Sequence, residues 1–154
     1  MGFEQSIQVF VTGGTFDKTY DHIKGTLNFQ KTHLPQMLVR SKCSLDIDVK
    51  TLMLLDSLEM TSTHFETIIK ACETCEKNKI VLTHGTDCMV DTAKKIAQEA
   101  IGIEQKTIIL TGAMIPYTFG SSSDGFFNLG SAMAYVGVLD PGVYIAMNGM
   151  LFNW

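Results

Sequence analysis

Short apolar runs, rich in β-branched residues, alternate along this chain with segments of helical periodicity. Four of the runs are apolar without interruption: Val9–Val11, Ile80–Leu82, Ile108–Leu110 and Val143–Ile145. Such runs are typical of strands that are covered on both faces of a parallel sheet. Strand and helix in alternation therefore predict an α/β fold of three layers, helix, sheet and helix, with a mainly parallel central sheet of the Rossmann-like or flavodoxin-like kind.

The periodicity also predicts the individual elements. Strands are expected at Gln8–Thr12, Asp46–Leu55, Lys79–Thr83, Thr107–Thr111 and Val143–Met147. Helices are expected at Leu34–Ser41, Thr63–Lys77, Met89–Ala100 and Asp124–Val138, the second of them beginning at the capping box Thr63-x-x-Glu66. The stretch Gly13–Thr32 has no periodicity, and an unstructured loop of this length in a compact domain is more often functional than idle.

Composition narrows the class of protein. The chain has 154 residues, 45% of them apolar, and no linker or low-complexity tract divides it, so one domain over residues 1–154 is expected. A net charge of −4 without a basic cluster disfavours nucleic-acid binding. No apolar run approaches a membrane span and no export signal opens the chain, so we expect a cytoplasmic protein without a membrane partner.

Two short patterns are interpreted as structural. Met1-Gly2-x-x-x-Ser6 matches the N-myristoylation pattern, but Phe3 and Glu4 look like residues that lead into a strand beginning near Ile7. Cys72-x-x-Cys75 has a spacing used by zinc or redox sites, yet no second ligand pair follows it among the four cysteines. The pair continues the helical stripe of Phe65, Ile68 and Ile69, so core thiols are expected, with neither metal nor cofactor.

Three of the expected strands end alike, in Thr12-Gly13-Gly14, Thr83-His84-Gly85 and Thr111-Gly112-Ala113. In an open parallel sheet, ligands bind at the carboxyl ends of the strands where the strand order reverses. Small residues there let a ligand approach the backbone and leave amide N–H groups for an anion or oxyanion. Tight turns alone would explain one such end, but three of them favour a site, together with the polar residues Thr15, Ser57, Thr86 and Asp87.

The chemistry of that site is interpreted from its side chains. Thr12-Gly13-Gly14-Thr15 has neither the Walker spacing nor the dinucleotide pattern, so phosphate binding is weakly supported. A hydroxyl nucleophile beside glycine amides, with a second hydroxyl next to a carboxylate, suits acyl transfer better. A serine-type triad would need a histidine, and the four histidines are scattered, with His33 and His64 expected at the surface.

At this point the chain resembles a known family. The segments that carry the resemblance are Thr12–Thr15, Asp56–Met60, Thr83–Met89, Thr111–Met114 and Ser123–Leu129, which look like the bacterial-type L-asparaginase/glutaminase family in order and spacing. The resemblance covers nearly the whole chain and corresponds to the family's N-terminal domain. It implies hydrolysis of asparagine, or of glutamine, to the acid and ammonia.

The resemblance also implies roles for single residues. Thr15 matches the nucleophile, Tyr20 the tyrosine that orients and deprotonates it, and Thr86 and Asp87 the threonine and aspartate of the family's Thr-Lys-Asp group. Implied contacts with the substrate are those of Gly14, Ser57, Glu59, Asp87 and Ala113, with Asp87 on the α-ammonium, Ser57 on the α-carboxylate, and the amides of Gly14 and Thr86 as the oxyanion hole. Alternatively, Thr86 and Asp87 cap the next helix, Ser57 belongs to a turn, and Tyr20 is a loop aromatic.

The chain departs from the family in three places. Leu58 and Glu59 stand where a polar residue and then Asn or Asp are more usual, and the family's catalytic lysine and C-terminal domain have no counterpart. Either the natural chain continues past Trp154, or the protein is a single-domain relative. Lys18 is a candidate substitute for the absent amine.

Two functions follow from this sequence. The first is an asparaginase-like amidohydrolase acting as a homo-oligomer, since the number of large apolar residues, among them Phe126, Phe127, Tyr144 and Trp154, exceeds what one small core absorbs. The second is a non-catalytic module that keeps the fold and binds an amino acid or serves an oligomer.

Overall fold

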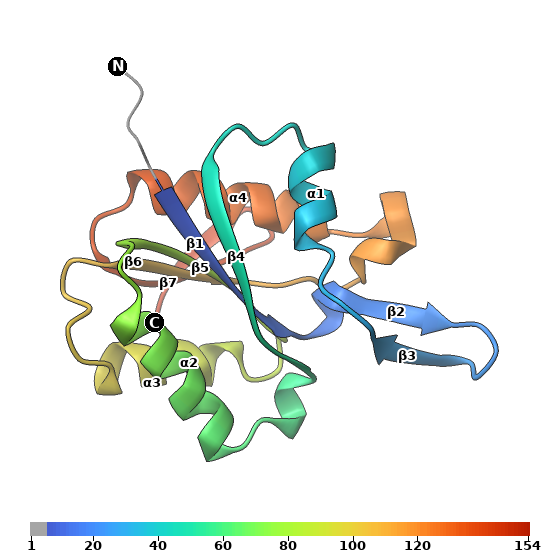
Figure 1. Cartoon of the computed structure of the whole chain (residues 1–154), viewed down its shortest axis with the longest axis horizontal. Helices are drawn as coiled ribbons and strands as arrows, with labels where there is room; N and C mark the ends of the chain where they lie inside the picture. Colours follow the sequence, from blue (N-terminus) through green and yellow to red (C-terminus); the bar gives the residue numbers. More distant parts are fainter. Residues whose placement is uncertain (1–5) are drawn as a thin grey trace.

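The continuous apolar runs form the middle of a six-stranded sheet in the computed structural model, which describes residues 6–154 (Figure 1). The strands are β1 (Ser6–Gly13), β4 (Asp46–Leu55), β5 (Lys79–Thr83), β6 (Thr107–Thr111), β7 (Gly142–Met147) and β8 (Met150–Asn153). Their order is β4-β1-β5-β6-β7-β8, in which β8 alone is antiparallel to its neighbour. The predicted mainly parallel sheet is thus confirmed.

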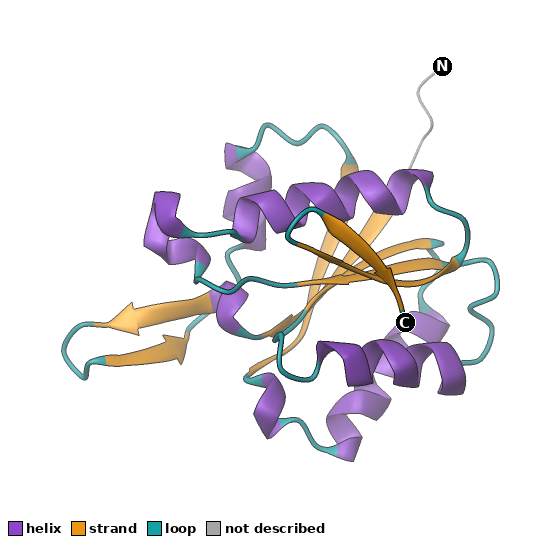
Figure 2. Cartoon of the chain, turned by 180° about the vertical axis from the view of Figure 1, so that it is seen from behind, coloured by secondary structure: helices purple, strands orange, loops and turns teal. Residues whose placement is uncertain are grey.

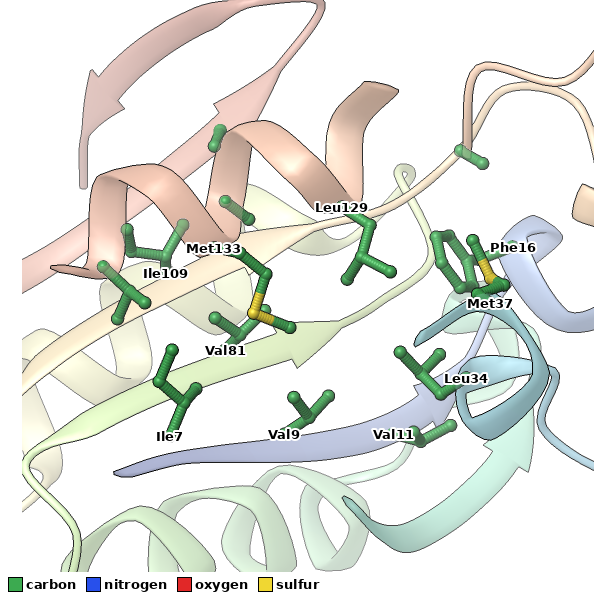
Figure 3. Packing of buried hydrophobic residues seen from close by; sticks show 14 of the residues in the cluster. Ile7, Val9, Val11, Phe16, Leu34, Met37, Val81, Ile109, Leu129 and Met133 are labelled. Carbon is green, nitrogen blue, oxygen red and sulfur yellow. The ribbon is translucent and has the colours of Figure 1, made fainter. Parts of the chain in front are cut away.

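Helices cover both faces of this sheet (Figure 2). One face carries α1 (Leu34–Arg40) and α4 (Gly125–Val138), and the other carries α2 (Ser62–Thr74) and α3 (Met89–Glu99). Successive strand residues alternate between the two layers, so Val81 packs with α1 and α4 whereas Ile80 and Leu82 pack with α2 and α3. Figure 3 shows the first of these cores, where Leu34, Met37 and Phe16 close the end nearest the carboxyl ends of the strands.

Helix α2 spans Ser62–Thr74, whereas the sequence predicted a helix over Thr63–Lys77. Its N-cap is Thr61 rather than Thr63, and the capping box pairs Thr61 with His64, whose Nδ1 accepts from the Thr61 N–H at 3.0 Å. A capping box usually has Glu or Gln at N3; His64 fills this position because its unprotonated ring nitrogen accepts the same hydrogen bond.

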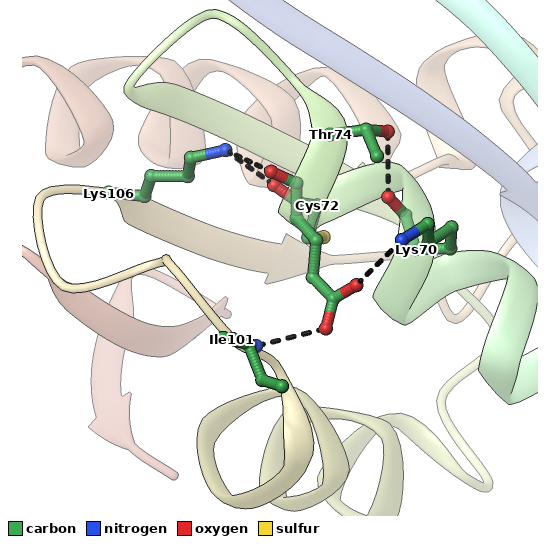
Figure 4. A network of polar contacts seen from close by, with 6 residues as sticks. Lys70, Cys72, Thr74, Ile101 and Lys106 are labelled. Carbon is green, nitrogen blue, oxygen red and sulfur yellow. Dashed lines mark hydrogen bonds and ion pairs between the residues drawn. The ribbon is translucent and has the colours of Figure 1, made fainter.

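The C-terminal end of α2 is held by a buried lysine. Lys106 Nζ donates to the carbonyl oxygens of Cys72 and Glu73 at 2.7 and 3.1 Å (Figure 4). It also donates to the Cys75 carbonyl at 2.6 Å. A cation at this position satisfies carbonyls that have no partner within the helix and opposes the negative end of its dipole. The Cys72 thiol lies in the core as expected, and burial raises its pKa to about 12.

The stretch predicted as a long loop is mostly structured. Residues Thr15–Asp17 form a 3₁₀ turn, and β2 (Lys18–Asp21) and β3 (Thr26–Phe29) form a hairpin that projects beside the main sheet (Figure 1). The sequence of this hairpin has no apolar alternation that would predict strands, because none of its strand residues is fully buried.

Two further expectations concern the N-terminal myristoylation pattern and membrane-spanning helices. Residues 1–5 of the N-myristoylation pattern lie outside the described residues. Within residues 6–154, no helix is long and apolar enough to cross a membrane.

Candidate active site

The topology creates a switch point between β1 and β5. The chain leaves β1 to form β4 on one side, and then crosses to form β5 on the other side of β1. The loops after β1 and β5 therefore run toward opposite faces of the sheet, and the carboxyl ends of two such strands are where ligands bind in open α/β sheets. Thr15 follows β1, and Thr86 and Asp87 follow β5, so the predicted site residues stand at this point.

Two glycines allow the turn after β1 to pack closely on the turns after β4 and β5. Gly13 and Gly14 have φ angles of 103° and 72°, which disfavour any residue with a Cβ. A Cβ on Gly14 would also overlap the backbone nitrogen of Gly85, and one on Gly13 would overlap Leu55. Only glycine therefore allows the turn that carries Thr15 to pack on the turn that carries Thr86.

Ser57 lies against the turn after β5, which carries Thr86. It is buried at the end of β4, its Oγ accepts from the Cys88 N–H at 3.3 Å, and a Cβ on Gly85 would overlap that oxygen. The preceding residue, Asp56, forms an ion pair with Lys18 Nζ at 2.6 Å, which lowers the pKa of Asp56. The turns after β1, β4 and β5 are thus linked to one another.

The turn after β6 is held by the start of α4. The Asp124 carboxylate accepts from the N–H groups of Met114 and Ile115 at 3.0 Å, and Asn128 Nδ2 donates to the Gly112 carbonyl at 2.8 Å. Ala113, an expected substrate contact, is buried in this turn. The Ser123–Leu129 segment, which carries part of the family resemblance, thus holds the turn after β6 in place.

The other predicted residues are more exposed. Thr86 is half-buried and Asp87 is exposed, as is Glu59 in the 3₁₀ turn Ser57–Glu59. An apolar hollow of about 420 Å³ opens beside Thr86, and its remaining lining residues are Met89, Val90, Met114, Ile145, Met147, Phe152 and Asn153.

Tyr20 is not brought against Thr15. It lies on β2 with 52% of its surface exposed, and its hydroxyl is 4.0 Å from the position of a Cβ on Gly25, at the turn of the hairpin. The base of the hairpin is anchored by Asp17, whose carboxylate accepts from the His33 N–H at 2.8 Å and from the Thr32 hydroxyl. Thr15 itself is half-buried at the start of the same 3₁₀ turn.

One expected oxyanion donor is already engaged. The Gly14 N–H donates to the Leu55 carbonyl at 2.9 Å, because the backbone after β1 crosses the end of β4 at close range. This is a correction to the expected pair of Gly14 and Thr86. Among residues 6–154, no backbone acceptor takes the N–H of Thr15 or of Thr86, so both of these amides are available to a ligand.

A buried histidine, His84, lies next to the site and has no predicted role. His84 is fully buried, its Nδ1 lies 2.7 Å from the Gly85 carbonyl, and its Nε2 lies 2.8 Å from the Thr92 hydroxyl. Burial lowers the pKa of this imidazole. Its place within the Thr83–Gly85 strand end was the available signal.

Comparisons with known proteins agree with this geometry. The family described as "Asparaginase, N-terminal" matches residues 6–153. The chain belongs to the asparaginase family. It is 35% identical over 91 residues to a glutaminase-asparaginase from Pseudomonas aeruginosa, an alignment that covers 57% of this chain and 24% of that protein.

Solved asparaginases share the fold. The thermostable L-asparaginase from Thermococcus kodakarensis is 25% identical with a TM-score of 0.80, and the match covers 96% of this chain and 45% of that one. For a probable cytoplasmic L-asparaginase from Campylobacter jejuni the identity is 26%, the TM-score is 0.81, and the coverage is 97% and 48%. The chain thus spans less than half the length of these relatives and corresponds to their N-terminal domain.

Proposed function

We propose that this asparaginase-family domain is an amidohydrolase that converts asparagine, or glutamine, to the acid and ammonia with Thr15 as nucleophile. The observation that carries the proposal is the contact between Gly14 and Gly85, since it sets the Thr15 turn against the Thr86-Asp87 turn at the switch point. A nucleophile, a second hydroxyl and a carboxylate thereby share one edge of the sheet.

The proposed chemistry is acyl transfer. The Thr15 Oγ attacks the side-chain carbonyl of the substrate, an ester forms as ammonia leaves, and water hydrolyses the ester to release the acid. The N–H groups of Thr15 and Thr86 would bind the oxyanion, and one such donor typically contributes about 3–4 kcal/mol to the transition state. We propose no metal or cofactor for this reaction.

Substrate binding is assigned to the residues around that centre. The exposed Asp87 would bind the α-ammonium and the Ser57 hydroxyl the α-carboxylate, because Ser57 Oγ accepts from Cys88 and keeps its own hydrogen to donate. Glu59 and Ala113 would contact the substrate from the turns after β4 and β6.

Thr15 also needs a proton acceptor, since a threonine hydroxyl is a weak nucleophile at neutral pH. Tyr20 would serve if the hairpin folded toward the switch point from its projecting position. Lys18 is the second candidate, as the proposed substitute for the family's lysine. Its ion pair with Asp56 is formed by the ammonium, so Lys18 would first pass its own proton to Asp56 or to water before accepting the proton of Thr15.

The second candidate function is a non-catalytic module that binds an amino acid or serves an oligomer. Two observations favour it: the Tyr20 hydroxyl lies at the far end of the hairpin, and the Lys18 amine is already engaged by Asp56. Such a module would bind asparagine at Asp87 and Ser57 without releasing ammonia.

Ammonia release from L-asparagine by the pure protein separates the two. We expect the parent to release ammonia and Thr15→Ala to lose this activity. The matched control Thr26→Ala, which removes an exposed threonine hydroxyl from β3 of the neighbouring hairpin, should retain it. Asparagine-dependent thermal stabilisation without turnover would establish the binding module instead.

Assembly and location complete the proposal. We propose a homo-oligomer in which a second copy covers the apolar hollow beside Thr86, because Met114, Phe152 and Trp154 expose 63%, 45% and 50% of their surfaces. Sedimentation velocity tests this, and Phe152→Glu should shift the assembly toward monomer. A cytoplasmic location is proposed from the similarity to the Campylobacter jejuni protein.

A further inference from the structure

The His84 imidazole bridges two elements behind the proposed site. Its Nδ1 faces the Gly85 carbonyl at 2.7 Å and its Nε2 faces the Thr92 hydroxyl of α3 at 2.8 Å. Both His84 and Thr92 are buried, with 0% and 1% of their surfaces exposed. The backbone of His84 is also fixed, because its N–H donates to the Thr111 carbonyl at 2.9 Å.

These partners select one tautomer of the ring. A carbonyl oxygen only accepts hydrogen bonds, so the nitrogen facing Gly85 must carry the hydrogen. With Nδ1 protonated, the neutral ring accepts the Thr92 hydroxyl hydrogen at Nε2. The Cys88 carbonyl, 3.1 Å from the same hydroxyl, keeps a donor in this arrangement because the Thr92 N–H reaches it at 3.0 Å.

A hydrogen bond to the Gly85 carbonyl also orients the next amide. The Gly85 C=O and the Thr86 N–H belong to one planar trans peptide unit and point in opposite directions. When the buried imidazole holds the carbonyl, the Thr86 N–H is aimed away from the interior. Within residues 6–154, that N–H has no backbone acceptor and is available to a ligand.

We propose that His84 is a positioning residue for the amide hydrolysis, which acts by fixing the Gly85–Thr86 peptide so that the Thr86 N–H donates to the oxyanion. The inference rests on the proposed function for its kinetic consequence, but not for its geometry. It gives a task to a histidine that neither acts as a base nor touches the substrate.

Two substitutions of similar polarity separate positioning from packing. The side-chain amide of His84→Asn can place a donor where Nδ1 stands, whereas that of His84→Gln reaches toward the Nε2 position. We expect His84→Gln to lower kcat for asparagine roughly 10- to 100-fold with little change in KM, since a misaimed oxyanion donor loses much of its effect. His84→Asn should retain kcat within about fivefold. Thr92→Val, which removes the hydroxyl bound to Nε2, should lower kcat, whereas Thr92→Ser, which keeps that hydroxyl, should not.

The control is thermal stability measured on the same variants. A packing role predicts that kcat follows the melting temperature, with His84→Asn and His84→Gln affected alike. That result would overturn the inference, whereas a kcat that follows the donor at the Nδ1 position supports it.

A second measurement needs no turnover. Nitrogen-15 NMR of the imidazole should show the Nδ1–H tautomer, and the Thr86 amide signal should move in His84→Gln but stay in His84→Asn. The Nε2–H tautomer, or a Thr86 amide that is unmoved in His84→Gln, would refute the positioning role even in an active enzyme. If the parent releases no ammonia, the proposed function fails while these spectra still decide the geometry.

Discussion

The Asp17 carboxyl should make the stability of this domain depend on pH in an unusual direction. Asp17 is 0% exposed and connects the 3₁₀ turn of Thr15 to Thr32 and His33, which flank the other end of the hairpin. Burial raises the pKa of Asp17 from its ordinary value of 3.8 to about 6, against the opposing effect of the hydrogen bonds from His33 and Thr32. Here the loss of hydration outweighs the hydrogen bonds gained.

The magnitude follows from the shift. From 3.8 to about 6, at about 1.4 kcal/mol for each pKa unit, the contribution amounts to roughly 3 kcal/mol. Between about pH 4 and pH 6 the unfolded chain has released this proton while the folded protein still holds it. The free energy of unfolding should therefore fall as the pH rises through this window, and stay level with respect to Asp17 above it.

Urea unfolding of the parent and of Asp17→Asn, from pH 3 to pH 7.5, measures the effect. Other carboxyl groups titrate in both proteins, so the difference between the two curves isolates Asp17. We expect the free energy of unfolding of the parent to fall by about 3 kcal/mol relative to the variant between pH 4 and pH 6. Thr32→Val, which removes a hydrogen bond to the carboxylate, should move the step to higher pH.

A difference that rises with pH would refute this reasoning. It would mean that the hydrogen bonds from His33 and Thr32 lower the pKa of Asp17 by more than burial raises it. A flat difference would mean that the carboxyl is hydrated in solution.

Three further predictions concern single side chains. Lys18→Ala should lower kcat for asparagine at least tenfold while Asp56→Asn, which breaks the same ion pair but keeps the amine, stays within threefold; a parental rate in Lys18→Ala would exclude the amine from the reaction. Lys106→Met should lower the free energy of unfolding by roughly 2–3 kcal/mol in urea titrations, because three carbonyls lose a charged donor, and a change near zero would contradict that account. Thr83→Val should raise the melting temperature, since the buried Thr83 hydroxyl has no partner within residues 6–154 and a methyl group removes about 1 kcal/mol of desolvation cost; a lower value would show that the hydroxyl is bonded in solution.

The sequence predicted the four central strands β1, β5, β6 and β7 well because many of their residues are buried, and it predicted the edge strand β4 although none of its residues is fully buried. The bounds of β4, β5 and β6 coincide with the predictions, and β1 and β7 differ only at their ends. The hairpin of β2 and β3 and the edge strand β8 were missed. No continuous apolar run marks β2 or β3, and β8, which contains Met150, Leu151 and Phe152, is short and exposed over most of its length.

The predicted site was recognisable as a set of strand ends, but not as a set of contacts. Thr15, Ser57, Thr86 and Ala113 lie at the carboxyl edge, as the repeated Thr-and-glycine endings indicated. The engagement of the Gly14 amide by Leu55 was not recognisable, because it depends on how closely two strands pass beyond their paired region.

Hydropathy and turn chemistry, which are properties of neighbouring residues, determined the layers, the parallel strands and the edge at which the active site is proposed. Tertiary structure alone decided which groups remain available there: Leu55 occupies one amide, His84 orients another, and Asp56 engages Lys18. The bonds of Gly14 with Leu55 and of Lys18 with Asp56 join residues that are remote along the chain, and their geometry exists only once the sheet brings the strand ends together.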